Sequence, residues 1–245
     1  MAGKSQGKKT MDTESELVIY GASGGIGQYL VEAFREEYKI FGTYCSGSPD
    51  KLVDGAEYYS VDVTDPQNVT AFTSEIAGRL NRPVMVYTPG ISPNSLLHKL
   101  KKEDWDRAMA INITGAMLAS QAILPRMRDV GYGRIILVSS VLARISVPGT
   151  AAYTASKAAQ CALARIIAVE NAKKGITANA LALGYYDVGI IRAVPEAYLN
   201  EHVIPGIPMK KLGDPANIVN AIRFVVNADY LTGATLDING GMITG

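Results

Sequence analysis

Short apolar runs alternate along the chain with stretches in which apolar residues recur every three or four positions. The runs typical of buried strands are 17–20, 39–45, 57–63, 83–87, 134–139, 176–182 and 234–238. Helical spacing covers 26–37, 64–80, 103–128, 151–173 and a stretch that opens at Asp214-Pro215. Strands that alternate with helices are joined by right-handed crossovers, which place helices on both faces of a parallel sheet. The pattern therefore predicts an α/β fold with a Rossmann-like, doubly wound parallel sheet.

Two stretches depart from this alternation. The helix over 103–128 contains Asn112, and we expect a break or bend near this polar residue. Residues 184–213 carry three prolines among Tyr, Ile and Val, so a flap at about 185–213 over a pocket and an ordinary surface excursion both fit. The polar residues 1–15 predict a disordered leader, and 16–245 show neither a repeat nor a linker and predict one domain.

Composition and charge narrow the classes of function. The chain has 245 residues and a formal net charge of +1, which argues against a broad surface for nucleic acid or an anionic membrane. Cys45 and Cys161 lack metal-binding spacing and suggest free thiols in a reducing compartment, while His98 and His202 are too far apart to predict a metal site. We find no signal peptide and no apolar run long enough to span a bilayer, so the sequence predicts a cytoplasmic protein.

Three glycines separate the first strand from the first helix. They are Gly21, Gly25 and Gly27 in the stretch VIYGASGGIGQYL. Glycine allows backbone to approach a ligand closely, and a helix N-terminus offers free amides and a positive dipole to a phosphate. A glycine-rich turn without a ligand is the alternative, but the strand–turn–helix context favours a bound phosphate.

A second motif lies in the helix over 151–173. Tyr153 and Lys157 are four residues apart and therefore share a face of that helix. An ammonium near a phenol lowers the phenol's pKa, so the pair can transfer a proton near neutral pH, although two such residues also share a helix by chance. Ser140 ends a preceding strand and can hydrogen-bond a substrate oxygen, and the carbonyl of Asn112 can hold a water that links Lys157 to solvent.

Together these motifs make the chain resemble a short-chain dehydrogenase/reductase of the single-domain type, with 3-oxoacyl-(acyl-carrier-protein) reductases as the nearest likeness. The resemblance covers about 17–245. The residues that carry it are the run Gly21 to Gly27, Asp62, Val63, Gly90, Asn112, Ser140, Tyr153, Lys157, Gly184 and the closing runs 231–233 and 239–241.

The resemblance implies a role for each matching position. Tyr153 is expected to donate the proton, Ser140 to orient the carbonyl and Asn112 to hold a relay water. Lys157 is expected to lower the pKa of Tyr153 and to bind the nicotinamide ribose. The residues expected to bind the cofactor are Gly21, Ser23, Gly25, Ile26, Gly27, Tyr44, Asp62, Val63, Gly90, Tyr153, Lys157, Gly184 and Val188.

Several positions differ from the family's usual pattern. Tyr20 and Val188 replace threonines, and Tyr87-Thr88-Pro89 replaces a segment whose amides brace neighbouring backbone. Pro89 also removes a backbone donor. These changes concern cofactor affinity and turnover, and none of them removes a catalytic group.

The second strand ends without the acidic residue that would bind a ribose diol and repel a 2′-phosphate. This favours NADP, although only Lys51 is placed to clamp the phosphate and NAD is possible. The expected reaction is reduction of a ketone, most simply a 3-oxoacyl thioester linked to coenzyme A or a carrier protein. The alternatives are a specialised alcohol dehydrogenase and a non-catalytic cofactor-binding subunit.

Lys173-Lys174 is either a landing patch for a carrier protein or a solvated pair of charges. The alanines at 151, 155, 158, 159 and 162 fit either a homotetramer interface or burial against the sheet.

Overall fold

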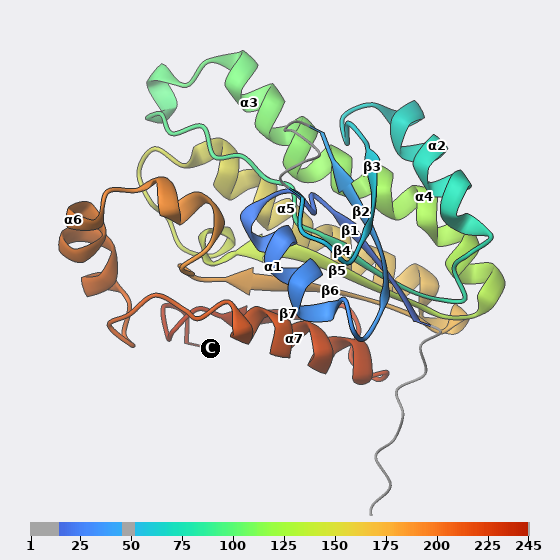
Figure 1. Cartoon of the computed structure of the whole chain (residues 1–245). Coiled ribbons are helices and arrows are strands. Elements are labelled where there is room, and N and C mark those ends of the chain that lie inside the picture. The colour runs from blue at the N-terminus through green and yellow to red at the C-terminus, as the bar shows by residue number, and fades with distance from the viewer. Residues whose placement is uncertain (1–14, 46–51, 245) are drawn as a thin grey trace, which may run out of the picture.

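A seven-stranded parallel sheet forms the centre of the computed structural model, which describes residues 15–45 and 52–244 (Figure 1). The strands are β1 (Ser15–Tyr20), β2 (Lys39–Tyr44), β3 (Glu57–Ser60), β4 (Arg82–Tyr87), β5 (Gly133–Ser140), β6 (Ile176–Leu183) and β7 (Thr235–Ile238). Their order is β3-β2-β1-β4-β5-β6-β7, and all neighbours pair in parallel. The order reverses between β1 and β4, which is the doubly wound topology that the sequence predicts.

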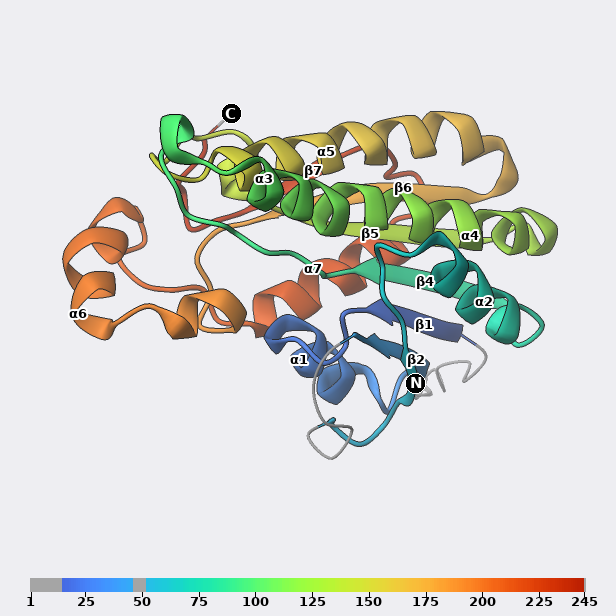
Figure 2. The same ribbon diagram turned by 90° about the horizontal axis from the view of Figure 1, so that it is seen from above.

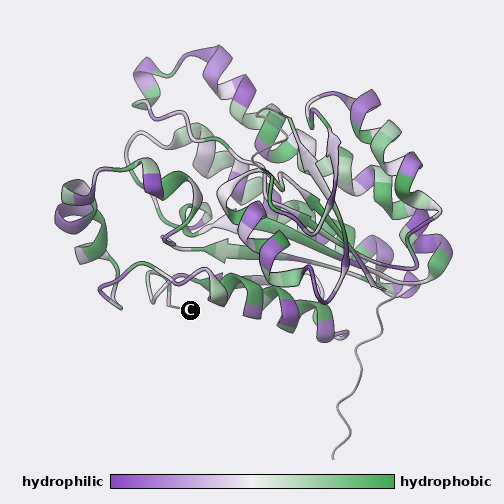
Figure 3. Cartoon of the chain, in the orientation of Figure 1, coloured by the Kyte–Doolittle hydropathy of each residue, from purple (hydrophilic) through white to green (hydrophobic). Residues whose placement is uncertain are grey.

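Helices cover both faces of the sheet. The main helices are α1 (Gly25–Phe34), α2 (Pro66–Ala77), α3 (Lys102–Met109), α4 (Gly115–Val130), α5 (Ala151–Asn171) and α7 (Ala216–Asn227). α2, α4 and α5 pack one hydrophobic core against one face, and α1 and α7 pack a second core against the other (Figures 1 and 2). The apolar residues accordingly concentrate on the central strands and on the inner sides of the helices (Figure 3).

Local sequence explains where the elements begin and end. The Asp65 side chain accepts a hydrogen bond of 2.8 Å from the amide of Gln67 and Pro66 follows it, so α2 starts as predicted. β5 and β6 are buried along their whole length, as expected of strands covered on both faces. β3 lies at the edge of the sheet and ends at Ser60, opposite Tyr44, so residues 61–63 leave the strand earlier than predicted.

The predicted break near Asn112 is confirmed. A π-helical turn, η3 (Ala110–Thr114), interrupts the helix between α3 and α4 and buries Asn112. The whole helix, Lys102–Val130, is long and apolar enough to cross a membrane by length and composition. The expectation that no apolar run is long enough to span a bilayer is therefore wrong by length and composition alone. The core helix of a soluble protein also meets these two conditions, so the finding is weak evidence for a membrane span.

The 184–213 segment consists of short helical turns. They are η6 (Gly189–Ala193), α6 (Glu196–Tyr198), η7 (Leu199–Val203) and η8 (Ile204–Gly206). In Figures 1 and 2 this segment projects to one side of the sheet, beyond the carboxyl ends of the strands. The predicted leader lies outside the described residues except for Ser15, which begins β1.

Candidate active site

A cavity of about 550 Å³ lies where β1, β2 and β4 end. Nine residues predicted to bind a cofactor line it: Gly21, Ser23, Gly25, Ile26, Gly27, Tyr44, Asp62, Val63 and Gly90. The remaining lining residues are Gly24, Thr43, Cys45, Val61, Thr88, Pro89, Ile111, Gly189, Ile190 and Arg192. The cavity therefore sits at the switch point of the sheet, the usual ligand position in doubly wound folds.

The glycines of the turn are required by close backbone contacts. A side chain at Gly27 would place its Cβ 2.2 Å from the carbonyl oxygen of Gly21, and one at Gly25 would lie 2.6 Å from the Cα of Gly189. Gly21 has a φ of +77°, which favours glycine. The N-cap of α1, Gly24, makes no side-chain capping bond, so nothing in the cap competes for the first amides of the helix. This cradle fits the phosphates of a dinucleotide.

Thr88 braces the glycine turn from the end of β4. Its hydroxyl donates to the carbonyl oxygens of Tyr20 at 2.8 Å and Gly21 at 3.2 Å. Its amide also donates to the Tyr20 carbonyl, at 3.2 Å. Thr88 thus replaces the bracing that the sequence suggested was lost at this position.

Thr88→Val should remove this brace while keeping the shape of the side chain. We expect the free energy of unfolding to fall by about 1–2 kcal/mol, because two carbonyls lose a donor. We also expect dinucleotide affinity to fall, since the turn is held less firmly. Denaturant unfolding and a nucleotide titration measure the two effects. Thr70→Val on the exposed face of α2 is the matched control, and an equal effect there would contradict the role of Thr88.

Lys157 is buried beneath Gly90, beside the cavity. Its Nζ donates to the carbonyl oxygen of Val138 at 2.7 Å and to Oε1 of Gln160 at 3.2 Å. It lies 5.6 Å from the centre of the Tyr153 ring. A side chain at Gly90 would approach Nζ to 3.3 Å, so only glycine leaves the amine open to this edge of the cavity.

Asn112 is held by four hydrogen bonds in the π-helical turn. Its side chain accepts from the amide of Ile91 and donates to the Ile91 carbonyl and to Oγ of Ser156, each at 2.9 Å. Its main-chain carbonyl oxygen accepts from Nε2 of Gln160 at 2.6 Å. The carbonyl that the sequence assigned to a water therefore already has a protein donor.

Ser140 lies at the end of β5, and Tyr153 lies in the first turn of α5. Ser140 lies near enough to Tyr153 to lower the pKa of its phenol, and Oγ of Ser140 accepts from the amide of Leu142 at 3.2 Å. The structure thus places Ser140, Tyr153, Lys157 and Asn112 in one connected group at the carboxyl edge of the sheet.

The electrostatics of this group differ from the sequence prediction. Burial raises the pKa of Tyr153, which the hydrogen bond from Ser140 opposes, and it lowers the pKa of Lys157 from 10.5 to about 7. The predicted lowering of the Tyr153 pKa by Lys157 is wrong for this structure. The physical reason is that burial dominates at both groups, because desolvation disfavours the charged phenolate of Tyr153 and the charged ammonium of Lys157.

Gly184 and Val188 do not border the cavity. A side chain at Gly184 would lie 2.7 Å from the Cα of Asn239, so this glycine serves the packing of β6 against the end of β7. Val188 is buried, and its amide donates to the Tyr186 carbonyl at 2.7 Å. The cofactor contacts expected of these two residues therefore stay predictions.

Sequence reasoning missed two further residues. Arg192 lies in η6 and lines the cavity, and its contact with Asp187 at 3.3 Å leaves both side chains largely exposed. Its position as a basic residue in the proline-rich segment 184–213 is the sequence feature that could have identified Arg192. Gln160 lies three residues after Lys157 and so shares its helix face, a spacing that could have identified it. Lys51, the predicted phosphate contact, lies outside the described residues.

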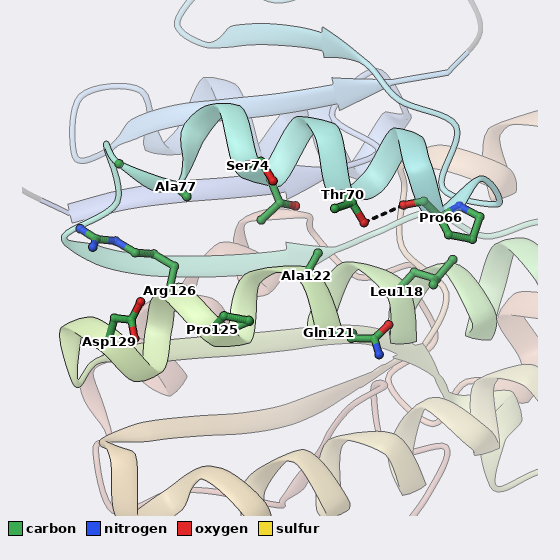
Figure 4. A pocket seen from close by; sticks show the side chains of 12 residues that line it. Pro66, Thr70, Ser74, Ala77, Leu118, Gln121, Ala122, Pro125, Arg126 and Asp129 are labelled. Carbon is green, nitrogen blue, oxygen red and sulfur yellow. Dashed lines mark hydrogen bonds between the residues drawn. The ribbon is translucent and has the colours of Figure 1, made fainter.

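A second hollow of about 600 Å³ lies between α2 and α4 (Figure 4). Its lining residues include Thr70, Ser74, Leu118 and Arg126, and none of the predicted site residues borders it. We therefore assign the chemistry to the cavity at the strand ends.

Known proteins resemble this chain over nearly its whole length. A family model described as enoyl-(acyl carrier protein) reductase matches residues 21–243. An acetoacetyl-CoA reductase of Rhizobium meliloti is 32% identical, over 91% of this chain and 96% of its own. A 3-oxoacyl-(acyl-carrier-protein) reductase of Vibrio cholerae is 32% identical, over 95% and 99%. The solved structure of ElxO with NADP bound is 27% identical with a TM-score of 0.87, covering 93% of this chain and 98% of that one. The chain belongs to the short-chain dehydrogenase/reductase family of oxidoreductases.

Proposed function

We propose that this protein reduces the ketone of a 3-oxoacyl thioester to a secondary alcohol with NADPH. The observation that carries the proposal is the connected group of Ser140, Tyr153 and Lys157 beside a cavity that fits a dinucleotide. The names of the relatives from Rhizobium meliloti and Vibrio cholerae support the substrate class.

The residues of the chain have distinct tasks in this reaction. The bound cofactor supplies the hydride. Ser140 orients the carbonyl oxygen, and Tyr153 gives its phenolic proton to that oxygen as negative charge develops there. The raised pKa of Tyr153 keeps the phenol protonated at neutral pH, as reduction requires. Lys157 contributes positive charge near the phenol when protonated, and Asn112 holds the π-helical turn beside it.

The cofactor is proposed to be NADP because, among the residues that the structure describes, the end of β2 brings no acidic side chain to the cavity. Thr43, Tyr44 and Cys45 line that corner, and Asp62 lies on the neighbouring segment after β3. The Asp62 carboxylate accepts from the amide and hydroxyl of Thr64, at 2.8 and 2.7 Å. The solved structure of ElxO with NADP bound supports this choice, and NAD is the alternative.

Arg192→Ala should lower the affinity of the protein for NADPH and for NADH equally. Arg192 borders the cavity beside Gly189, which packs on Gly25 of the phosphate cradle, so we assign it to the shared pyrophosphate. An exposed charged contact predicts a loss of about 5- to 10-fold in affinity for both nucleotides. Fluorescence titration measures it, with Arg107→Ala on α3 as the control. A loss confined to NADPH would instead assign Arg192 to the 2′-phosphate.

The 184–213 segment is proposed to be a flap over the substrate. It begins at the end of β6 and returns to the site through Gly189, and it carries the exposed apolar side chains of Ile190, Tyr198 and Met209. These side chains suit a substrate with a hydrocarbon part.

Docking of a carrier protein is the less supported part of the substrate proposal. Lys173 and Lys174 lie in η5 (Ala172–Lys174), before the amino end of β6, whereas the cavity lies at the carboxyl ends. The eight residues of β6 separate these edges by about 26 Å. A coenzyme A thioester needs no such patch, and we place it first.

A homotetramer is proposed through α4 and α5. Ala158 and Ala162 are exposed on α5, so their burial against the sheet, the alternative from the sequence, is wrong. Ile166 and Val169 continue the same exposed stripe, and Met117 is exposed on α4. Apolar stripes of this kind favour helix packing between subunits.

A cytoplasmic location is part of the same proposal. Cys45 and Cys161 are both free thiols, with Cys45 exposed. Exposed free thiols suit a reducing compartment.

The deciding experiment follows the absorbance of NADPH, and separately NADH, with acetoacetyl-CoA, crotonyl-CoA and simple secondary alcohols. Turnover of acetoacetyl-CoA with NADPH supports the proposal. Reduction of crotonyl-CoA alone would replace it with enoyl reduction, and turnover of the alcohols alone would favour a specialised dehydrogenase. Nucleotide binding without any turnover would favour a non-catalytic subunit.

A further inference from the structure

Gln160 is a fully buried amide that the proposed reaction does not use. It lies on the buried side of α5, one turn after Lys157. Burying an amide is costly unless its donor and acceptor are both satisfied. Both are satisfied here, and each partner belongs to the catalytic group.

The two ends of the Gln160 amide join two different elements. Nε2 donates to the carbonyl oxygen of Asn112 at 2.6 Å, in the π-helical turn η3. Oε1 accepts from Nζ of Lys157 at 3.2 Å, on α5. A π-helical turn disrupts the regular helical ladder, and the nearby carbonyl of Ile111 accepts from the hydroxyl of Tyr87 at 2.5 Å. Two side chains, Tyr87 and Gln160, thus hold adjacent carbonyls of this turn.

We propose that Gln160 is a positioning residue of the active site, whose amide locks the Lys157 amine to the main chain at Asn112. The inference rests on the proposed function for its kinetic consequence. An amide neither gives up nor takes up a proton near neutral pH, so this bridge fixes the position of Lys157 without passing protons to it. Asn112 is expected to contribute through the same bridge rather than through a water on this lone pair.

The surroundings of Lys157 make its protonation sensitive to this bridge. From α5 it is faced by Tyr153 and by Cys161, and the electrostatic interaction with Cys161 raises the pKa of Lys157. From β5 its Nζ meets the Val138 carbonyl, and the hydroxyl of Ser139 donates to the main-chain oxygen of Lys157 at 2.8 Å. The side chain of Asn112, in η3, lies beside Gly90 as Nζ does. Among the described residues, no carboxylate contributes to its pKa. The Gln160 oxygen is therefore one of two hydrogen-bond acceptors that favour the ammonium.

Two variants separate a positioning role from simple packing. Gln160→Met keeps the volume and removes both bonds, so the Lys157 pKa should fall, and kcat should drop by about 3- to 10-fold with KM nearly unchanged. Gln160→Glu keeps the shape and adds a charge, so the Lys157 pKa should rise by about 1–3 units. Asn171→Leu removes another buried amide from α5 and should lower stability without moving the Lys157 pKa.

The test titrates the nucleotide-free protein by NMR with ¹³C-labelled lysine side chains, the Lys157 signal being assigned by its loss in Lys157→Met. Opposite shifts in Gln160→Met and Gln160→Glu, mirrored by the pH profile of kcat, support the bridge. The same titration midpoint in both variants as in the wild type overturns it. If Gln160→Met does not fold, Gln160→Glu decides alone. Because the titration needs no turnover, absence of ketone reduction would reject the proposed function and leave this result standing.

Discussion

Tyr153→Phe is expected to lower kcat/KM for ketone reduction at least about 100-fold, because the variant keeps the ring and loses the proton donor. The phenol lies in the first turn of α5, near Ser140 at the end of β5. The phosphate cradle lies on another element, at the start of α1, and the substitution leaves it untouched. Nucleotide affinity, measured by NADPH fluorescence, should therefore stay within a few-fold of the wild type.

The control for this prediction is Tyr186→Phe. Tyr186 is a buried tyrosine whose hydroxyl donates to the carbonyl oxygen of Ile238 at 3.0 Å, away from the catalytic group. That variant should lose some stability and keep most of its activity. Near-normal turnover in Tyr153→Phe would remove Tyr153 from the proton-donor role and would leave the reaction without an acid at this position.

The sheet could be predicted from the sequence because its strands are short apolar runs that helices cover on both faces. β5 and β6 are the clearest cases, since a strand buried on both sides needs no polar alternation. The edge strand β3 is shorter than predicted, because Val61 and Val63 continue its apolar pattern but line the cavity, with Asp62 between them, instead of pairing. Capping residues predicted the start of α2 well because that signal is local.

The site could be predicted only where its function depends on spacing along one element. The glycine turn and the Tyr153–Lys157 pair are such cases. The bridge from Gln160 to Asn112 joins residues 48 positions apart, and the brace from Thr88 to Tyr20 joins residues 68 apart, so neither is visible in a local pattern. The direction of the Lys157 pKa shift also depends on burial, which spacing on a helix does not reveal.

Lys157→Met is expected to abolish most of the activity and to stabilise the fold at neutral pH. In the folded protein burial lowers the pKa of Lys157 from 10.5 to about 7, so between these values the unfolded chain binds more protons. The stability of the wild type therefore rises with pH across this window and is penalised below it. At pH 7 the penalty is about 4 kcal/mol, and removing the amine should recover much of it. Urea unfolding from pH 6 to 10 should show a difference in the free energy of unfolding between variant and wild type that narrows as the pH rises.

The control is Lys101→Met, at an exposed position, which should follow the wild-type curve. A difference that stays constant over this range would show that the buried amine does not titrate there and would contradict the lowered pKa of Lys157.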